Sequence, residues 1–165
     1  MSAKSEPQAL VHPIPPLFDA QSRVLILGSF PSVKSREAKF FYGHPQNRFW
    51  RVLAALTGSP LPATIEEKKR LILENHFALW DSIASCTITG SSDSSIRDVV
   101  PNALSVILDH APIEKIFCNG AASLACYRRY IEPVTHRAAS ALPSTSPANA
   151  AWTLERLIEA WRVIL

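Results

Sequence analysis

Four short apolar runs recur along the chain, and a polar or glycine-containing stretch follows each of them. The clearest is RVLILG at residues 23–28, which is continuous in apolar side chains and ends in a glycine. Such a run is typical of a strand that is buried on both faces of a parallel sheet. The other runs are HFALWD at 76–81, EKIFCNG at 114–120 and VTHRAASAL at 134–142. We expect these four runs to form one sheet.

Segments with helical periodicity lie between the predicted strands. Residues 48–57 carry apolar side chains at helical spacing and are followed by Gly58, which predicts a helix that ends there. Thr64 and Glu67 have the spacing of a capping box, so a second helix is predicted to begin at this point and to run to about Asn75.

Two further helices complete the pattern. A helix of about ten residues is predicted after the strand at 114–120. The apolar positions of AAWTLERLIEAWRVIL predict a closing helix within residues 150–165. Strands that alternate with helices predict an α/β fold, a three-layer α/β/α sandwich around a mostly parallel four-stranded sheet. We expect one domain over residues 1–165, in which residues 1–20 are a loosely packed N-terminal segment.

Composition narrows the class of protein. The hydrophobic share of 47% and the charged share of 19% are those of a folded globular chain. The net charge of +3 permits an anionic partner without identifying one. No apolar run is long enough for a signal peptide or a membrane helix, which predicts a protein without a membrane partner.

Cysteine, histidine and glycine spacings exclude several kinds of site. The three cysteines form no CxxC pair, which argues against a disulfide framework and a thiolate cluster and favours a reducing cytoplasm. The five histidines lack the spacing of a zinc motif, and no Walker loop or GxGxxG is present. We therefore predict no metal and no cofactor.

Polar clusters follow three of the predicted strands: GSFPS at 28–32, CNG at 118–120 and PSTSPAN at 143–149. The carboxyl ends of parallel strands meet at one edge of a sheet, and ligands bind there in open α/β folds. We expect these three segments to converge on one site.

The residue types near this edge fit a nucleobase joined to phosphate. Tyr42, with Phe40 and Phe41 beside it, offers flat rings for stacking, and the amides of Asn47 and Asn119 can pair with the edge of a base. Hydroxyl and cationic groups suited to phosphate oxygens are supplied by Ser32, Lys34, Ser35, Arg36, Ser144, Thr145 and Ser146.

The same residues also fit purely structural roles. The aromatics before the helix at 48–57 have the composition of core packing, and Asn47 has the place and chemistry of a helix cap. Asn119 before Gly120 can close a strand-to-helix turn, and an isolated His44 is more often structural or exposed than catalytic. Residue types alone leave both interpretations open.

Three motifs, taken in order and spacing, are similar to those of a known family. VLILGSFPS, FYGHPQNRFW and LPSTSPAN before a final amphipathic helix resemble the uracil-DNA glycosylase superfamily, and within it the mismatch-specific and hypoxanthine branches. The resemblance extends from about residue 23 to the C-terminus. It implies that a damaged base is extruded from the duplex into a pocket.

The resemblance implies roles for particular residues. Tyr42 would stack on the extruded base, with Phe30 and His44 also beside it, and Asn119 would read the base edge. The loop Pro143–Asn149 would grip phosphate and wedge the duplex, and its expected DNA contacts are Pro143, Ser144, Thr145, Ser146 and Asn149, together with Ser32 and Lys34 of the first loop.

One departure from the family pattern affects catalysis. Mismatch-specific relatives have an Asn at the third position of the first motif, where it positions the attacking water, and this chain has Phe30. The resemblance to the hypoxanthine branch, whose first motif likewise lacks that polar residue, makes Asn47 the expected catalytic amide. Asn119 would assist by stabilising the departing base, and Ser29 and His44 are further polar candidates.

The resulting hypothesis is a monofunctional base-excision repair glycosylase that removes hypoxanthine from DNA and leaves an abasic site. Its expected partner is DNA that contains deaminated bases, and we expect a monomer in the cytoplasm, associated with the nucleoid. The alternatives are a mismatch-specific uracil-DNA glycosylase, a catalytically silent DNA-lesion binder and a hydrolase of free nucleosides. An assay of base release separates these four. Hypoxanthine is released by the first, uracil by the second and no base by the lesion binder, whereas the hydrolase acts on free inosine.

Overall fold

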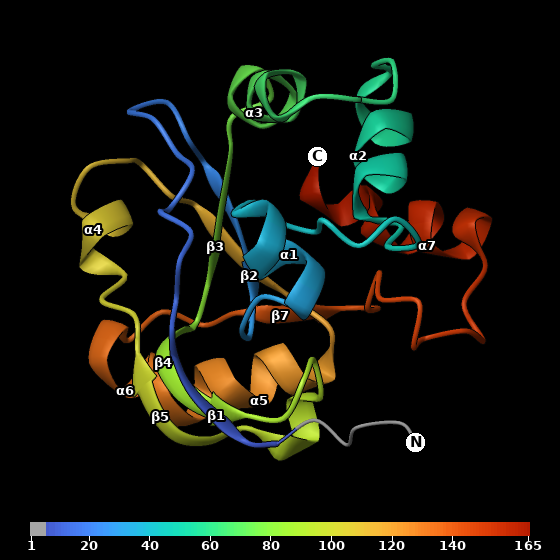
Figure 1. The fold of residues 1–165 in the computed structure, drawn as a ribbon. Helices are drawn as coiled ribbons and strands as arrows, with labels where there is room; N and C mark the ends of the chain where they lie inside the picture. The colour runs from blue at the N-terminus through green and yellow to red at the C-terminus, as the bar shows by residue number, and fades with distance from the viewer. Residues whose placement is uncertain (1–5) are drawn as a thin grey trace, which may run out of the picture.

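A four-stranded parallel sheet forms the centre of the computed structural model, which describes residues 6–165 (Figure 1). The strand order is β3-β2-β6-β7, and each neighbouring pair runs parallel. The strands are β2 (Val24–Gly28), β3 (Phe77–Asp81), β6 (Lys115–Asn119) and β7 (Ser140–Leu142). The four predicted strands are therefore present in one sheet. β2 is one of the two inner strands, which agrees with its continuous apolar run.

The fourth strand is shorter than predicted. Of the run at 134–142, only Ser140–Leu142 is a strand. The first two residues of the run belong to the short helix α6 (Glu132–Thr135). Pro133 lies in the first turn of this helix, where the missing N–H costs nothing, and His136 ends it in the left-handed conformation with φ of 56°. Val134 is 77% exposed, so the apolar residue that suggested a strand lies on the surface.

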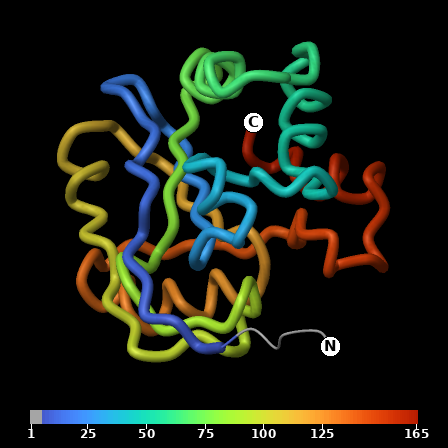
Figure 2. Tube along the Cα trace, viewed as in Figure 1, coloured from blue at the N-terminus to red at the C-terminus, as the bar shows by residue number. Residues whose placement is uncertain are grey.

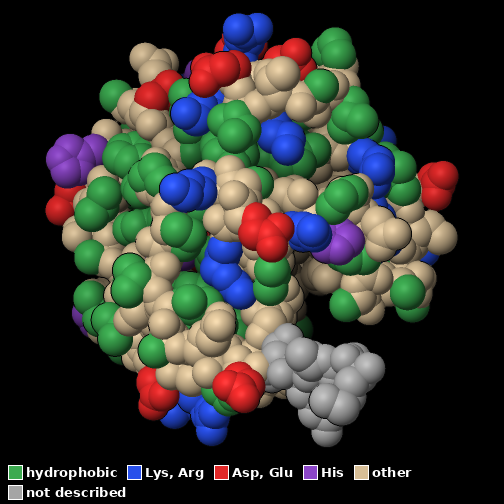
Figure 3. All heavy atoms as spheres, in the orientation of Figure 1, with side chains coloured by type: hydrophobic (Ala, Val, Ile, Leu, Met, Phe, Trp, Pro, Cys, Tyr) green, Lys and Arg blue, Asp and Glu red, His purple; other side chains and the backbone are tan. Residues whose placement is uncertain are grey.

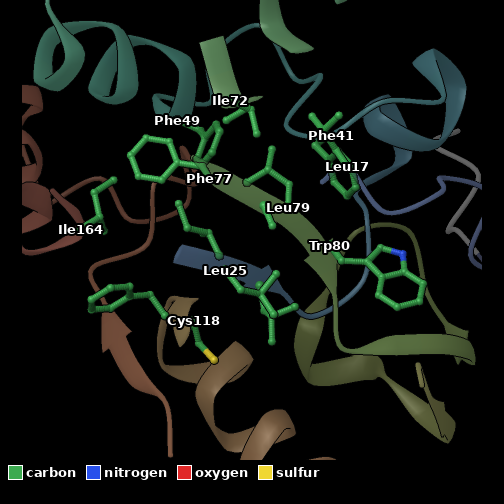
Figure 4. Packing of buried hydrophobic residues seen from close by; sticks show 14 of the residues in the cluster. Leu17, Leu25, Phe41, Phe49, Ile72, Phe77, Leu79, Trp80, Cys118 and Ile164 are labelled. Carbon is green, nitrogen blue, oxygen red and sulfur yellow. The ribbon is translucent and has the colours of Figure 1, made fainter. Parts of the chain in front are cut away.

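Helices cover both faces of the sheet, which confirms the predicted three-layer α/β/α architecture. Helix α5 (Ala121–Tyr130) packs against one face, and α2 (Phe49–Thr57) and α7 (Leu154–Trp161) pack together on the other (Figure 1). In the close-up of the core, Phe49 and Phe77 lie together on the side of α2, whereas Cys118 points toward α5 (Figure 4). The predicted helices at 48–57 and after β6 are confirmed.

A second sheet, which the sequence analysis did not predict, packs beside the first. It is antiparallel in the order β1-β4-β5 and consists of β1 (Gln8–Val11), β4 (Ile83–Ile88) and β5 (Arg97–Pro101). Register shifts interrupt the pairing of β4 with β5, and only Val99 of β5 is even half-buried. The polar sequence of β5 therefore lacks the regular alternation from which a strand is predicted.

The N-terminal segment is packed more closely than expected. Residues 1–5 lie outside the described residues, but β1 pairs along its whole length with β4. Ile14 is buried, and Leu17 forms a bridge with Leu79 of β3. In Figures 1 and 2 this segment runs alongside β3 down the length of the sheet. The expectation of loose packing over residues 1–20 is therefore wrong for the part of the segment from β1 to Leu17.

Two of the remaining helices, those at 33–38 and 65–74, begin at a side chain that caps the first turn by a hydrogen bond. The remaining helices and turns are α1 (Val33–Ala38), α3 (Ile65–Glu74), α4 (Ser105–Leu108) and the 3-10 turns Asp93–Ser95 and Arg162–Ile164. Thr64 accepts a hydrogen bond from the N–H of Glu67 at 3.1 Å, as the capping-box spacing predicted. The Glu67 carboxylate accepts in turn from the N–H of Ala63 rather than from Thr64 itself.

This cap gives a stability prediction. Thr64→Ala is expected to lower the free energy of unfolding by about 1 kcal/mol, because the N–H of Glu67 loses its partner. Urea denaturation followed by circular dichroism measures the change. Thr64→Ser keeps the hydroxyl and is expected to unfold close to the unsubstituted protein, so an equal loss in both variants would contradict the capping role.

Candidate functional site

A cavity of about 150 Å³ opens at the carboxyl edge of the parallel sheet. Its walls come from residues Gly28–Ser32 after β2, Asp81 at the end of β3, Asn119 at the end of β6, and Ser144–Ser146 after β7. The predicted convergence of the three polar segments therefore occurs, since the strands are parallel and their carboxyl ends share one edge. Tyr42 and Asn47 also line this cavity.

The ring of Tyr42 is held in place from one side. It stacks on Phe49 with 3.9 Å between ring centroids and 19° between planes, and its backbone has a positive φ of 53°. This conformation is uncommon for a side chain of this size, and it is found where surrounding structure enforces it. Phe40, Phe41, Phe49 and Trp50 are buried in the core. Phe41 also lines the cavity, but Tyr42 is the aromatic that brings a hydroxyl to it.

The hydroxyl of Tyr42 is buried, and no group among residues 6–165 forms a hydrogen bond with it. Burial raises the pKa of this phenol and the neighbouring charge of Asp81 raises it further, whereas the nearby side chain of Asn119 acts in the opposite direction. The hydroxyl therefore keeps its proton at neutral pH. A buried O–H without a partner is a donor available to a molecule in the cavity.

Asn47 lines the cavity and also forms a hydrogen bond at the start of a helix. Its Oδ1 accepts a hydrogen bond from the N–H of Phe49 at 2.9 Å, which satisfies one of the free donors at the start of α2. The backbone cap residue itself is Arg48, which makes no side-chain capping bond. The described part of the chain forms no hydrogen bond with Nδ2 of Asn47, so the amide N–H groups remain available beside the cavity.

Asn119 is more constrained than predicted. Its Nδ2 donates to Oγ1 of Thr145 at 2.9 Å, and its Oδ1 accepts from the N–H of Thr145 at 3.0 Å. This pair of bonds fastens the loop after β7 to the end of β6. Gly120 follows with φ of 99°, and a Cβ there would lie 3.2 Å from Cβ of Ser144, so the tight approach of loop and strand requires a glycine.

Arg48, which had no role in the sequence analysis, holds the loop that follows β7. Its guanidinium donates to the backbone carbonyls of Ser146 at 2.8 Å and Asn149 at 3.1 Å, and also to that of Trp152. Its backbone N–H donates to the carbonyl of Thr145 at 3.1 Å. The loop 143–152 has no regular secondary structure, so these bonds determine its shape.

Thr145 is fully buried, and its N–H, hydroxyl and carbonyl are all engaged inside the protein. The structure does not leave it free for DNA. Pro143, Ser144, Ser146 and Asn149 line a wider hollow of about 550 Å³ that adjoins the first cavity. The surface is recessed between the loop 143–152 and the body of the molecule (Figure 3).

Three predicted residues differ in their access to the cavity. Ser32 lines it, and its Oγ also caps α1 by accepting from the N–H of Ser35. Lys34 is exposed on α1, outside the cavity, with its ammonium 3.6 Å from the carboxylate of Glu37. His44 does not line the cavity, and its Nδ1 accepts from the N–H of Gln46 within the turn.

Ser29 and Phe30 form one wall. Phe30 is buried and supplies an apolar surface. Its ring lies edge-on to His12 with 5.9 Å between ring centroids, and the Arg36 guanidinium lies 5.7 Å from its centroid. Ser29 donates to Oδ1 of Asp93 at 2.8 Å. Desolvation raises the pKa of Asp93, although the hydrogen bond from Ser29 opposes this shift. Polar chemistry on this wall therefore comes from Ser29 and Asp93 rather than from position 30.

Asp81 and His12 form a buried pair that the sequence analysis missed. Nε2 of His12 lies 2.7 Å from Oδ2 of Asp81, and the two side chains are 4% and 6% exposed. Asp81 is a polar residue at the carboxyl end of a buried strand. The other site candidates were chosen because they lie at such strand ends, so the same criterion would have found Asp81. His12 lies 69 residues away, in a segment expected to be loose, and carried no such signal.

Residues 6–165 contain no cluster of three or more His, Cys, Asp or Glu side chains that could hold a metal ion. In the same range, no helix has both the length and the apolar character needed to cross a membrane. Cys118 is buried behind the cavity, and burial raises the pKa of its thiol to about 12. The thiol is therefore protonated at neutral pH, which does not suit a nucleophile.

Comparisons with known proteins agree with this arrangement. A family model described as the uracil DNA glycosylase superfamily matches residues 15–165. A protein of Methanosarcina acetivorans named hypoxanthine DNA glycosylase is 30% identical over 151 residues, which cover 91% of this chain and 94% of that protein. A Methanosarcina barkeri protein of the same name is 33% identical over 111 residues, 66% of this chain and 70% of its own length.

A solved structure is similar over nearly the whole fold. It is a solution NMR structure from Methanosarcina acetivorans, described as a candidate uracil DNA glycosylase. The similarity has a TM-score of 0.76 at 28% sequence identity and covers 92% of this chain and 96% of that one.

Proposed function

This chain belongs to the uracil DNA glycosylase superfamily, and we propose that it removes hypoxanthine from DNA as a monofunctional glycosylase of base-excision repair. The name that two relatives carry, hypoxanthine DNA glycosylase, supports this substrate. The single observation that supports the chemistry best is the cavity itself, where a fixed ring and free amide and hydroxyl donors surround a space closed by the ends of parallel strands.

The reaction requires the base to leave the helical stack. Enzymes that act on a base in a duplex extrude the nucleotide into a pocket, at a cost of roughly a few kcal/mol. In our proposal the extruded base lies against Tyr42, whose other face is supported by Phe49, and against the apolar wall of Phe30. The apolar wall excludes water from the face of the base.

Hydrolysis replaces the bond from the sugar C1′ to N9 of the base by a bond from C1′ to the oxygen of water. Positive charge develops on the sugar and negative charge on the departing base, which finally takes up a proton. Donors aimed at the base therefore stabilise the transition state more than the ground state. We assign this role to Nδ2 of Asn47 and to the remaining N–H of Asn119, which can reach acceptors such as O6 and N7 of hypoxanthine.

The attacking water needs an orienting group, because Phe30 has none. Ser29 is the candidate on that wall, since its hydroxyl is already oriented by the carboxylate of Asp93. No lysine lines the cavity among the described residues, so a lyase step through a Schiff base is not part of the proposal. The expected product is an intact strand with an abasic site.

DNA contacts are proposed along the rim of the cavity. Ser32, Ser144 and Ser146 are the hydroxyl groups nearest to it, and Pro143 and Asn149 extend the surface into the wider hollow. The loop is rigid enough to wedge a duplex because Arg48 binds several of its carbonyls. On the face seen in Figure 3, Lys and Arg side chains are scattered singly among apolar and acidic ones, so we expect moderate rather than strong electrostatic attraction.

We propose a monomer that acts on DNA in the cytoplasm, at the nucleoid. A uracil-excising enzyme is the second candidate, favoured by the description of the solved neighbour. A lesion-binding protein without activity is the third, because a phenylalanine stands at position 30.

An activity panel tests the proposal. We expect the purified protein to produce an alkali-labile site at hypoxanthine in a duplex, more slowly at uracil, and none at adenine in the same position. Denaturing electrophoresis after alkali treatment measures the product, and repetition over a range of salt reports the phosphate contacts. Binding without release would support the lesion binder, and the absence of product from every duplex would contradict a glycosylase.

A further inference from the structure

We infer that Asp93 receives the proton of the attacking water through Ser29, and that a second cavity behind this pair keeps the Asp93 carboxylate hydrated while DNA covers the site. The inference deepens the proposed function and rests on it. It adds a destination for the proton to the orienting role of Ser29, and it assigns a use to a cavity that has no part in the assignments above.

Asp93 lies where three hollows meet. It borders the candidate site, the wider hollow of about 550 Å³ and a third cavity of about 200 Å³, here called the rear cavity. The rear cavity lies between α5 and the antiparallel sheet, beside β4 and β5 (Figure 1). Its apolar lining consists of Ile83, Ile96, Val99, Ala122 and Ala125. Ser29 and Asp93 line both the rear cavity and the candidate site, so their hydrogen bond separates the two.

The turn that carries Asp93 is attached to the loop after β2. Asp93 begins a 3-10 turn in the connection from β4 to β5. Just before this turn, Oγ of Ser91 accepts from the N–H of Val33 at 2.9 Å. The guanidinium of Arg36 donates to the carbonyl of Gly90 at 3.0 Å. Contacts between separate elements therefore hold the carboxylate at this place.

Among the described groups that line the site, the carboxylate of Asp93 is the one that can take up this proton. Oγ of Ser29 donates to its Oδ1 at 2.8 Å, so the lone pairs of Oγ can accept from a water molecule. The other carboxylate, that of Asp81, is paired with His12 at 2.7 Å. The phenol of Tyr42 keeps its proton at neutral pH, because burial raises its pKa.

The proton transfers balance over the whole reaction. The water oxygen forms a bond to C1′ while the bond from C1′ to N9 breaks, and the electron pair of that bond leaves with the base. The water proton passes to Oγ of Ser29 as the hydroxyl proton of Ser29 passes to Oδ1 of Asp93. Asp93 then gives its proton to solvent, and the hypoxanthine anion takes one up from solvent. One water is consumed, and no proton is gained or lost overall.

The position of this carboxylate is unfavourable for DNA binding alone. Asp93 is exposed and borders the wider hollow, whose rim is proposed to contact DNA. A negative charge there repels phosphates. The same charge stabilises the positive charge that develops on the sugar during bond cleavage. The chemistry of the step therefore accounts for a carboxylate that binding would disfavour.

The rear cavity matters because the front of the site closes when DNA binds. Desolvation raises the pKa of Asp93, and the charge of Asp81 raises it further, although the hydrogen bond from Ser29 opposes both. A duplex over the front removes more water and brings phosphates near, and each effect raises the pKa again. Helix α5 runs away from the carboxyl edge, and the rear cavity follows it for about two turns, to Arg129 and Tyr130. Solvent in this cavity keeps the carboxylate ionised.

Four elements place charged or titratable groups around Asp93. These groups are Asp81 of β3, Cys86 of β4, Arg36 of α1, and Cys126 and Arg129 of α5. Burial raises the pKa of both thiols, to about 11 for Cys126, so neither changes its charge at acidic pH. Carboxyl groups and histidines do titrate there, and Asp81 is paired with His12. Substitution at position 93 is therefore needed to assign an acidic loss of rate.

Asp93→Asn tests the proton transfer without removing the hydrogen bond. Asparagine keeps an oxygen that accepts from Ser29 but takes up no proton, so a purely structural role would survive the change. In single-turnover excision by the full chain, we expect hypoxanthine release at pH 7 to fall at least about thirtyfold. Ser29→Ala is expected to lose a similar factor, and the double variant no more than either single one.

The pH profile of the same assay gives a second measurement. In the unsubstituted protein the rate is expected to fall on acidification as Asp93 becomes protonated, and its raised pKa places this fall above the ordinary carboxyl range. In Asp93→Asn this fall is expected to be absent. Asp109→Asn is the matched control, because it removes an exposed carboxylate at the end of α4, and its profile is expected to equal that of the unsubstituted protein.

Ala125→Leu tests the rear cavity. Ala125 lines this cavity but not the candidate site, so a leucine there displaces solvent behind Asp93. The acidic fall is expected to move to higher pH, with the rate at pH 6 reduced at least about threefold more than the rate at pH 8. Ala55→Leu makes the same change at an exposed position of α2, away from these cavities, and is expected to leave the profile unchanged.

The outcomes separate the inference from the proposed function. An unchanged rate in Asp93→Asn, or a reduced rate with the acidic fall retained, would overturn the role of Asp93 while the glycosylase remains. Equal profiles for Ala125→Leu and Ala55→Leu would overturn the role of the rear cavity. If the unsubstituted protein releases neither hypoxanthine nor uracil from DNA, the proposed function itself fails. Thermal unfolding of each variant identifies any loss of rate that comes from a loss of folded protein.

Discussion

Asn47→Ala is expected to lower the single-turnover rate of hypoxanthine release about a hundredfold, or about 2.7 kcal/mol of barrier. The reason is that Nδ2 of Asn47 is a side-chain donor at the cavity that no described residue engages. A donor of this kind interacts most strongly with the charge of the departing base, which exists only as the bond breaks. Rapid-quench measurement with excess enzyme isolates this step from product release.

The same substitution removes a helix cap, so a second variant is needed. Asn47→Asp keeps an oxygen that can accept from the N–H of Phe49 but replaces the amide donor by a carboxylate. We expect Asn47→Asp to unfold at the same urea concentration as the unsubstituted protein and to lose most of the excision rate. A full rate in Asn47→Asp would show that the acceptor, rather than the donor, matters and would assign the leaving-group role elsewhere.

Arg48→Ala is expected to have the largest effect on stability, about 3 kcal/mol of the free energy of unfolding. The guanidinium donates to the carbonyls of Ser146, Asn149 and Trp152, and hydrogen bonds from charged donors are among the stronger ones. Its removal leaves several carbonyls of the loop 143–152 without partners. Urea denaturation gives the stability, and excision is expected to fall as well because the rim of the cavity loses its shape.

Arg51 supplies the matched control for this experiment. It lies on the exposed side of α2, the helix that Arg48 precedes, and makes one long contact, 3.5 Å from Nη2 to the carbonyl of Pro45. Arg51→Ala is expected to change the free energy of unfolding by less than about 0.5 kcal/mol. Arg48→Lys keeps the charge without the planar fork and is expected to fall between the two. Equal stability of Arg48→Ala and Arg51→Ala would contradict the role of Arg48.

Much of the fold followed from local patterns in the sequence. The runs at 23–28, 76–81 and 114–120 each have a continuous apolar centre because the middle of each strand is buried on both faces, and this signal does not depend on what the strand packs against. The antiparallel sheet had no such signal. β5 is mostly exposed and its pairing with β4 is irregular, so its residues neither alternate nor form an apolar run.

The candidate site was predictable where its residues end a strand or belong to a motif. Tyr42, Asn47 and Asn119 do line one cavity, as the sequence led us to expect. The use of Asn47 Oδ1 by its own helix followed from its place before that helix, but the use of the Asn119 amide by Thr145 was not predictable, because the two residues are 26 positions apart. Thr145 itself, expected at the DNA, is buried.

The sequence by itself determined the parallel sheet, the helices that flank it and the edge at which the polar segments meet, because apolar periodicity and strand direction are local properties. Only the tertiary structure decided which atoms at that edge remain free to bind. His12 and Asp81 are separated by 69 positions, and Arg48 contacts carbonyls about a hundred positions further on. Hydrogen bonds between such distant groups depend on three-dimensional packing, and no spacing along the chain encodes them.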